Sequence, residues 1–132
     1  MQHDEFVGQV QHRAQLSALG DAERATRALL ETLAERLDGG EAKDLAAQLP
    51  REIGLHLTRD EKRAWESERL SLDEFYQRVS ERESVDLPVA IFHARAVMSV
   101  VEEAVSAGEM SDVRQQLGEE FAPLFEFENI PS

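Results

Sequence analysis

The feature that most constrains this chain is that most of its sequence occurs twice. An offset of 69 residues superimposes Asp4 on Asp73, and an offset of 68 residues superimposes Ala22 on Ala90, with one residue dropped near Leu19. The identical pairs are Asp4/Asp73, Glu5/Glu74, Phe6/Phe75, Val10/Val79, Arg13/Arg82, Ala22/Ala90, Arg27/Arg95, Ala28/Ala96, Glu35/Glu103, Gly40/Gly108, Glu41/Glu109, Asp44/Asp112, Gln48/Gln116, Leu49/Leu117 and Glu52/Glu120. A period of about 70 residues exceeds the roughly 20–50 residues of most solenoid repeats, so we interpret the pattern as duplication of a larger unit.

Each copy contains three stretches with helical periodicity. The first covers 4–15 and 72–84, where a Phe and a Val lie four residues apart on one face. The second covers 21–37 and 88–105, and its apolar residues occupy more than half of the circumference, which is typical of a helix contacted from several sides. The third covers 39–49 and 107–117. The sequence therefore predicts an all-α fold: a helical bundle of two tandem three-helix repeats with pseudo-twofold symmetry.

The helix ends carry recognisable capping patterns. Ser71-x-x-Glu74, Asp38-x-x-Glu41 and Ser106-x-x-Glu109 all have the spacing of a capping box, which predicts a structural role for each Glu. Pro50 either ends the third helix of the first copy or starts a short new helix through Ile53.

The predicted organisation is one domain over 1–132. Repeat one covers 3–57, a charged linker covers 58–70, repeat two covers 71–126, and a short tail covers 127–132. Trp65, the only tryptophan, is expected to anchor the linker, and the tail is expected either to pack back or to stay mobile.

Composition excludes several classes of function. The formal net charge is −13, which disfavours binding to nucleic-acid phosphates and to anionic membranes. The chain has no cysteine, which excludes disulfides, thiolate metal sites and cysteine nucleophiles and fits a reducing compartment. No apolar run approaches the roughly 18 residues of a membrane span, and the opening residues lack the basic character of a signal peptide. We therefore expect a cytoplasmic protein without nucleic-acid or membrane partners.

The pattern resembles the prokaryotic family known as domain of unknown function 2267. The resemblance rests on Asp4-Glu5-Phe6 with Val10, Arg27-Ala28-Leu29, Gly40-Glu41 through Leu49-Pro50, and the second copies that start at Asp73-Glu74-Phe75. It covers nearly the whole chain and implies a small helical protein with two repeats. It brings no activity, ligand or catalytic residue that could be transferred. The chain departs from the repeated pattern at Gly118, which replaces the Pro, and at Gln2, which replaces the capping Ser.

The repeated polar residues are the candidate site. They are Arg27, Glu35, Asp44 and Gln48 in the first copy, and Arg95, Glu103, Asp112 and Gln116 in the second. Carboxylates at i and i+3, such as Glu41 with Asp44, could bind a hard cation, and each arginine could clamp an anion. The alternative, which we favour, is structural: helix caps, and salt bridges that tie Arg27 to Asp44 and Arg95 to Asp112.

The sequence favours a non-enzymatic protein-interaction or regulatory module. It contains no pairing of a nucleophile with a base and no histidine spacing suited to a metal, so we predict no enzyme activity and no cofactor. Trp65 and Phe92 are candidate apolar anchors for a protein partner or for self-association. The alternative is a protein that binds a metal or small ligand through the repeated carboxylates.

Overall fold

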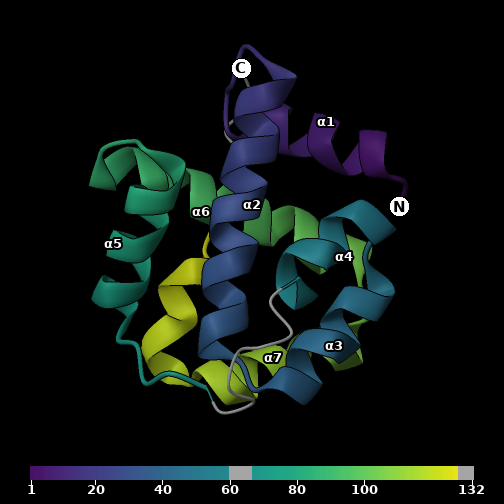
Figure 1. Ribbon diagram of the computed structural model, residues 1–132, viewed down its shortest axis with the longest axis vertical. Coiled ribbons are helices and arrows are strands. Elements are labelled where there is room, and N and C mark those ends of the chain that lie inside the picture. Colours follow the sequence, from purple (N-terminus) through teal and green to yellow (C-terminus); the bar gives the residue numbers. More distant parts are fainter. Residues whose placement is uncertain (60–66, 128–132) are drawn as a thin grey trace.

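The computed structural model describes residues 1–59 and 67–127. Figure 1 shows helices joined by loops in this part of the chain, with no strand among the described residues. The predicted all-α class is confirmed. The elements are α1 (His3–Arg13), α2 (Leu19–Arg36), α3 (Gly39–Gln48), α4 (Arg51–Thr58), α5 (Leu72–Glu83), α6 (Leu87–Ala104), α7 (Ala107–Leu117) and the 3₁₀ helix η1 (Glu119–Phe125). We call α1–α4 the first half and α5–η1 the second half. Trp65 lies outside the described residues.

The two longest helices, α2 and α6, form the centre of the molecule. Each has 18 residues, and α2 runs lengthwise through Figure 1 with α5 on one side and α4 on the other. Helix α6 contacts α1, α2, α5 and η1. Leu33 of α2 and Val101 of α6 are fully buried, as are most of the apolar residues around them. The wide apolar stripe therefore has the role expected from the sequence, because neighbours cover each central helix from several directions.

Each half contains four helical segments, which corrects the predicted count of three. Of the two alternatives at Pro50, the structure has the new helix: α4 begins after Pro50 and continues to Thr58, beyond the predicted end at Ile53. Gly54 lets α4 approach α3 closely, since a Cβ atom at this position would lie 2.7 Å from the backbone oxygen of Ala46. Eight residues with a central glycine have little helical tendency alone, so packing against α3 and α2 stabilises this segment.

The fourth segment of the second half is a 3₁₀ helix. Pro123 lies inside η1 and has no N–H with which to continue an α-helical ladder. Gly118 precedes η1 with a φ of +86°, a conformation that a residue with a side chain rarely adopts. The fourth segments of the two halves therefore differ in helix type because of their own sequences.

No single helix in the described ranges is long and apolar enough to cross a membrane. Helices α5 and α6 meet the length and composition requirement only as a pair, and that pair is bent by 97°.

Candidate functional site

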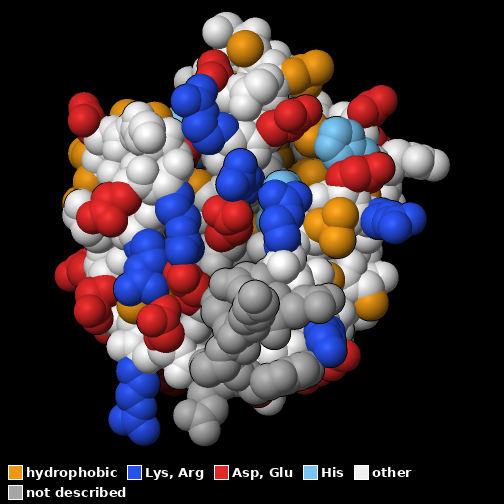
Figure 2. All heavy atoms as spheres, viewed as in Figure 1, with side chains coloured by type: hydrophobic (Ala, Val, Ile, Leu, Met, Phe, Trp, Pro, Cys, Tyr) orange, Lys and Arg blue, Asp and Glu red, His pale blue; other side chains and the backbone are white. Residues whose placement is uncertain are grey.

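The repeated arginines and glutamates of the first two helices form ion pairs between the halves. Arg82 of α5 donates two hydrogen bonds of 2.7 Å to the Glu35 carboxylate of α2, and Arg78 adds a third of 3.1 Å. In the opposite direction, Arg13 of α1 donates a hydrogen bond of 2.7 Å to Glu103 of α6. Figure 2 shows acidic and basic side chains side by side over α2 and α5. Glu35 and Glu103 therefore each accept a charged hydrogen bond from an arginine of the other half.

Burial and charge act in opposite directions on Glu35. Burial alone raises the pKa of this carboxyl, but the hydrogen bonds and positive charges of Arg82 and Arg78 outweigh burial and lower the pKa below its ordinary value. Glu35 is therefore ionised at neutral pH, as a partner of two arginines must be.

The predicted salt bridge between Arg27 and Asp44 is wrong. Arg27 instead pairs with Glu31, one turn along its own helix, at 3.2 Å. Arg95 lies near Tyr76, where burial raises the pKa of the tyrosine hydroxyl and the arginine opposes that shift. Arg27 and Arg95 thus lie in different surroundings and do not converge on one anion site.

Each repeated glutamine caps a helix of the other half. Gln48 accepts a hydrogen bond of 2.7 Å from the backbone N–H of Ser106, which precedes α7. Gln116 accepts one of 3.0 Å from the backbone N–H of Asp38, which precedes α3, and donates one of 2.6 Å to the Asp38 carboxylate. Because these two donors lie at helix N-termini, the glutamines satisfy groups that the helices leave unpaired.

This exchange of caps releases two glutamates. The side chains of Asp38 and Ser106 accept hydrogen bonds from the N–H groups of Glu41 and Glu109, at 2.7 and 3.1 Å. The return bond of a capping box is missing in both places, since a glutamine from the other half already occupies the donor. Only the box at Ser71 is complete among the described residues. The two predicted capping boxes of α3 and α7 are therefore half formed.

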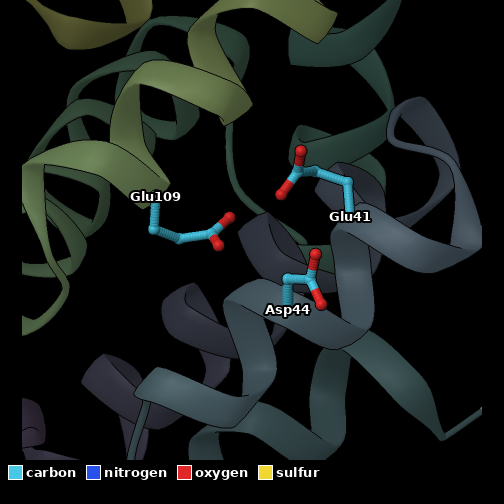
Figure 3. Close-up of side chains that lie close together, drawn as sticks. All are labelled: Glu41, Asp44 and Glu109. Carbon is cyan, nitrogen blue, oxygen red and sulfur yellow. The ribbon is translucent and has the colours of Figure 1, made fainter.

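The released glutamates and an aspartate converge between α3 and α7. Figure 3 shows Glu41 and Asp44 of α3 and Glu109 of α7 directed towards a common space. One carboxylate oxygen from each lies within 4.8 Å of the other two. We call these three residues the carboxylate cluster. Asp112, the repeat counterpart of Asp44, contributes further negative charge to it.

Glu109 is the most unusual member of the carboxylate cluster. It is 7% exposed, and its Oε2 atom makes no hydrogen bond within the part of the chain that the structure describes. Burial, followed by the adjacent Glu41 and the charges of Asp44 and Asp112, raises the pKa of Glu109 to about 8. A buried carboxylate with an unpaired oxygen is costly, so this position favours either a proton or a bound cation.

The donor set of the carboxylate cluster is suited to a hard cation. Oxygens that ligate one Ca²⁺ at about 2.3–2.6 Å lie no more than about 5 Å apart, which agrees with the spacing found here. Three carboxylates without nitrogen or sulfur donors favour Ca²⁺, Mg²⁺ or Mn²⁺ over softer metals. Asp44 is exposed, so water can reach the remaining coordination positions.

Phe92 packs against the chain's own C-terminal region. Its ring lies 6.0 Å from the ring of Phe127 and is half-buried. The second predicted anchor, Trp65, is outside the described residues. His93, next in the chain, is buried and hydrogen-bonded to the buried Glu83.

Sequence reasoning paired Glu41 with Asp44 as a possible cation site but did not predict that Glu109 of the other half lies beside them. The repeat of Gln48 and Gln116 is the sequence signal that could have revealed this arrangement. Each glutamine can bind the backbone N–H that a capping-box glutamate would otherwise bind, so Glu41 and Glu109 are not needed there. No curated protein matches this chain. A family model matches residues 3–124, and its description is that of an uncharacterised conserved protein. The chain belongs to that family, domain of unknown function 2267.

Proposed function

We propose that this protein is a non-enzymatic regulatory module whose carboxylate cluster binds a divalent cation between its two halves. The observation that carries the proposal is the buried, unpaired Oε2 atom of Glu109, directed towards Glu41 and Asp44. Side chains of both α3 and α7 would ligate a cation at this point. Its binding free energy therefore stabilises the contact between the halves.

The reciprocal contacts support an origin by duplication with approximate twofold symmetry. Arg13 pairs with Glu103 while Arg82 pairs with Glu35, and Gln48 and Gln116 exchange caps in the same reciprocal way. In a twofold arrangement each contact occurs twice with the partners exchanged. The cation site then lies close to the axis, where Glu41 faces its own counterpart Glu109.

A cation resolves the electrostatic conflict of the carboxylate cluster. Two like charges near each other in a buried place cannot both ionise at low cost, so the cation-free protein holds a proton there at neutral pH. A divalent cation supplies the missing positive charge and replaces that proton. In this proposal the carboxylates act as ligands and take part in no reaction, and the protein works in the cytoplasm.

The proposal is tested by melting protein stripped with EDTA in the presence of Ca²⁺, Mg²⁺ or Mn²⁺. A cation at 100 times its Kd should stabilise the fold by about 2.7 kcal/mol. The double variant Asp44→Asn with Glu109→Gln should lose that response. The matched control is Asp73→Asn with Glu120→Gln, which removes two exposed carboxylates elsewhere and should keep it. An equal response from both double variants would mean that the ions only screen the net charge of −13, and the proposal would fail.

A further inference from the structure

We propose that the groove between α7 and η1 is a docking site for a basic amphipathic helix of a partner protein. The groove has a volume of about 720 Å³. Ala107 and Met110 of α7 line one wall, and Ala122 and Phe125 of η1 line the other. The groove lies apart from the carboxylate cluster, and the proposal does not depend on cation binding.

The first half shows why this groove is open. At the corresponding place in the first half α4 packs directly on α3, because Gly54 fits against the backbone of Ala46. At the repeat offset of 68 residues, Ala122 replaces Gly54 and Arg114 replaces Ala46. Both replacements add side-chain atoms at the point of closest approach, so η1 cannot pack on α7 as α4 packs on α3.

Arg114 fixes the open arrangement. Its guanidinium donates a hydrogen bond of 3.0 Å to Glu102 of α6 and lies 4.2 Å from the centre of the Phe125 ring. Glu102 thus holds the arginine in place and neutralises it within the groove. The rest of the lining is apolar at Ala107, Met110, Ala122 and Phe125 and polar at Ser111, Gln115 and the exposed Glu119.

The first half also indicates the kind of element that closes such a place. There an amphipathic helix buries Ile53 and Leu57 against its neighbours. In the second half η1 takes the place of α4 and buries Phe121 and Leu124. A partner helix with apolar residues at the spacing of Ile53 and Leu57 would instead pack beside η1, on the two walls of the α7–η1 groove. The net charge of −13 indicates what the other face of the partner helix should carry. Lysines or arginines on that face would be attracted, whereas a second copy of this acidic chain would be repelled.

The test uses a synthetic helical peptide with Leu at positions i, i+3, i+4 and i+7 and Lys on the opposite face. Two control peptides are the same composition scrambled so that no apolar face forms, and the same apolar face with Glu in place of Lys. Fluorescence anisotropy measures affinity, and amide chemical shifts locate the site. We expect the first peptide to bind at least tenfold more tightly than both controls, with the largest shifts in α7 and η1.

Protein variants decide whether the groove is responsible. Ala122→Trp fills the groove and Ala107→Lys repels a basic peptide, and both replaced residues are exposed, so folding should persist. Each should weaken binding at least tenfold, while Ala47→Trp, at an exposed position of α3, should not. Equal binding of all the basic peptides, or loss with Ala47→Trp as well, would overturn the proposal.

Two other occupants give distinct results. A dimer in sedimentation that Ala122→Trp abolishes would identify the groove as a self-association surface and would contradict the partner proposal. A chain ending at Phe127 that binds the peptide at least tenfold more tightly than the full chain would assign the groove to the protein's own C-terminal residues. Either result replaces the partner helix with another occupant.

Discussion

The two halves place the glutamate of the same ion pair at different depths. Glu35, in contact with Arg82 and Arg78, has a side chain that is 15% exposed, whereas Glu103, in contact with Arg13, is 56% exposed. Both pairs join the first helix of one half to the second helix of the other. Two copies of one residue therefore need not contribute equally to the free energy of unfolding, because burial decides how strongly water screens each ion pair.

The largest expected effect comes from the repeated phenylalanines of α1 and α5. Phe6 and Phe75 are both fully buried, so replacing either by Ala should cost about 3–5 kcal/mol of unfolding free energy. Phe75 also makes an edge contact with Phe121 at 5.4 Å, which should add about 0.5–1.5 kcal/mol to its cost. Urea unfolding of both variants measures the difference. A larger cost for Phe6→Ala would show that the first half dominates stability.

The next effect concerns the ion pairs themselves. Glu35→Gln should cost about 1.5–3 kcal/mol at pH 7, because it weakens charged hydrogen bonds in a partly buried place. Glu103→Gln should cost no more than about 1 kcal/mol, because its carboxylate is exposed. The pKa of Glu35 is lowered from 4.5, so the deficit of Glu35→Gln should be complete above pH 4.5 and shrink as the pH falls below it. Equal costs at pH 7 would contradict the role assigned to burial.

A third comparison sets Gly54 of α4 against Ala122 of η1. Gly54→Ala should destabilise the protein by about 1–3 kcal/mol, because the added methyl group meets the Ala46 backbone and α4 must shift. Ala122→Gly, in the open second half, should cost less than about 1 kcal/mol. Denaturation midpoints of the two variants provide the measurement. A stabilising Gly54→Ala would mean that helix propensity outweighs the close packing of α3 with α4.

The last comparison concerns pH, and its effect is complete only above about pH 8. Because the folded-state pKa of Glu109 is raised to about 8, the folded protein binds more protons than the unfolded chain between about pH 4.5 and 8. Stability should therefore fall as the pH rises through this window. Glu109→Gln should remove the fall and be more stable than the parent at pH 9, by up to about 5 kcal/mol for a shift from 4.5 to about 8, with little difference at pH 4. The more exposed Glu41, replaced by Gln, should change less. Melting curves from pH 4 to 9 in EDTA would reveal a parallel loss in the variant if another group were responsible.

The sequence was sufficient to predict the first three helices of each half and their apolar faces. The predicted 107–117 helix matches α7, and the predicted 21–37 helix differs from α2 (Leu19–Arg36) by two residues at its start and one at its end. Periodicity reports which face of a helix is apolar, and that information is local. Helix α4 was underestimated because it is short and contains Gly54, and its stability comes from contacts with α2 and α3 that a local pattern does not contain.

The candidate site was predicted only in part. Asp44 was recognised as a possible cation ligand, but Glu109 was assigned to a cap, because the spacing from Ser106 satisfies the capping pattern. What overrides that pattern is Gln48, whose side chain reaches Ser106 from a distance of 58 residues along the chain. The spacing of residues describes one helix at a time, so it cannot indicate which half supplies a partner.

The reciprocal contacts have a consequence for a chain cut in two. A peptide of residues 1–58 contains Arg13 and also Glu35, the repeat counterpart of the Glu103 that Arg13 binds. It also contains Gln48 and the start of α3 at Asp38, the counterpart of the Ser106 that Gln48 caps. The groups that Arg13, Glu35, Gln48 and Asp38 bind across the boundary therefore have counterparts on a second copy of the same peptide. We therefore expect the isolated N-terminal fragment to form a homodimer that reproduces the shape of the whole protein. Such a dimer would be the arrangement from which a gene fusion could have produced the present chain.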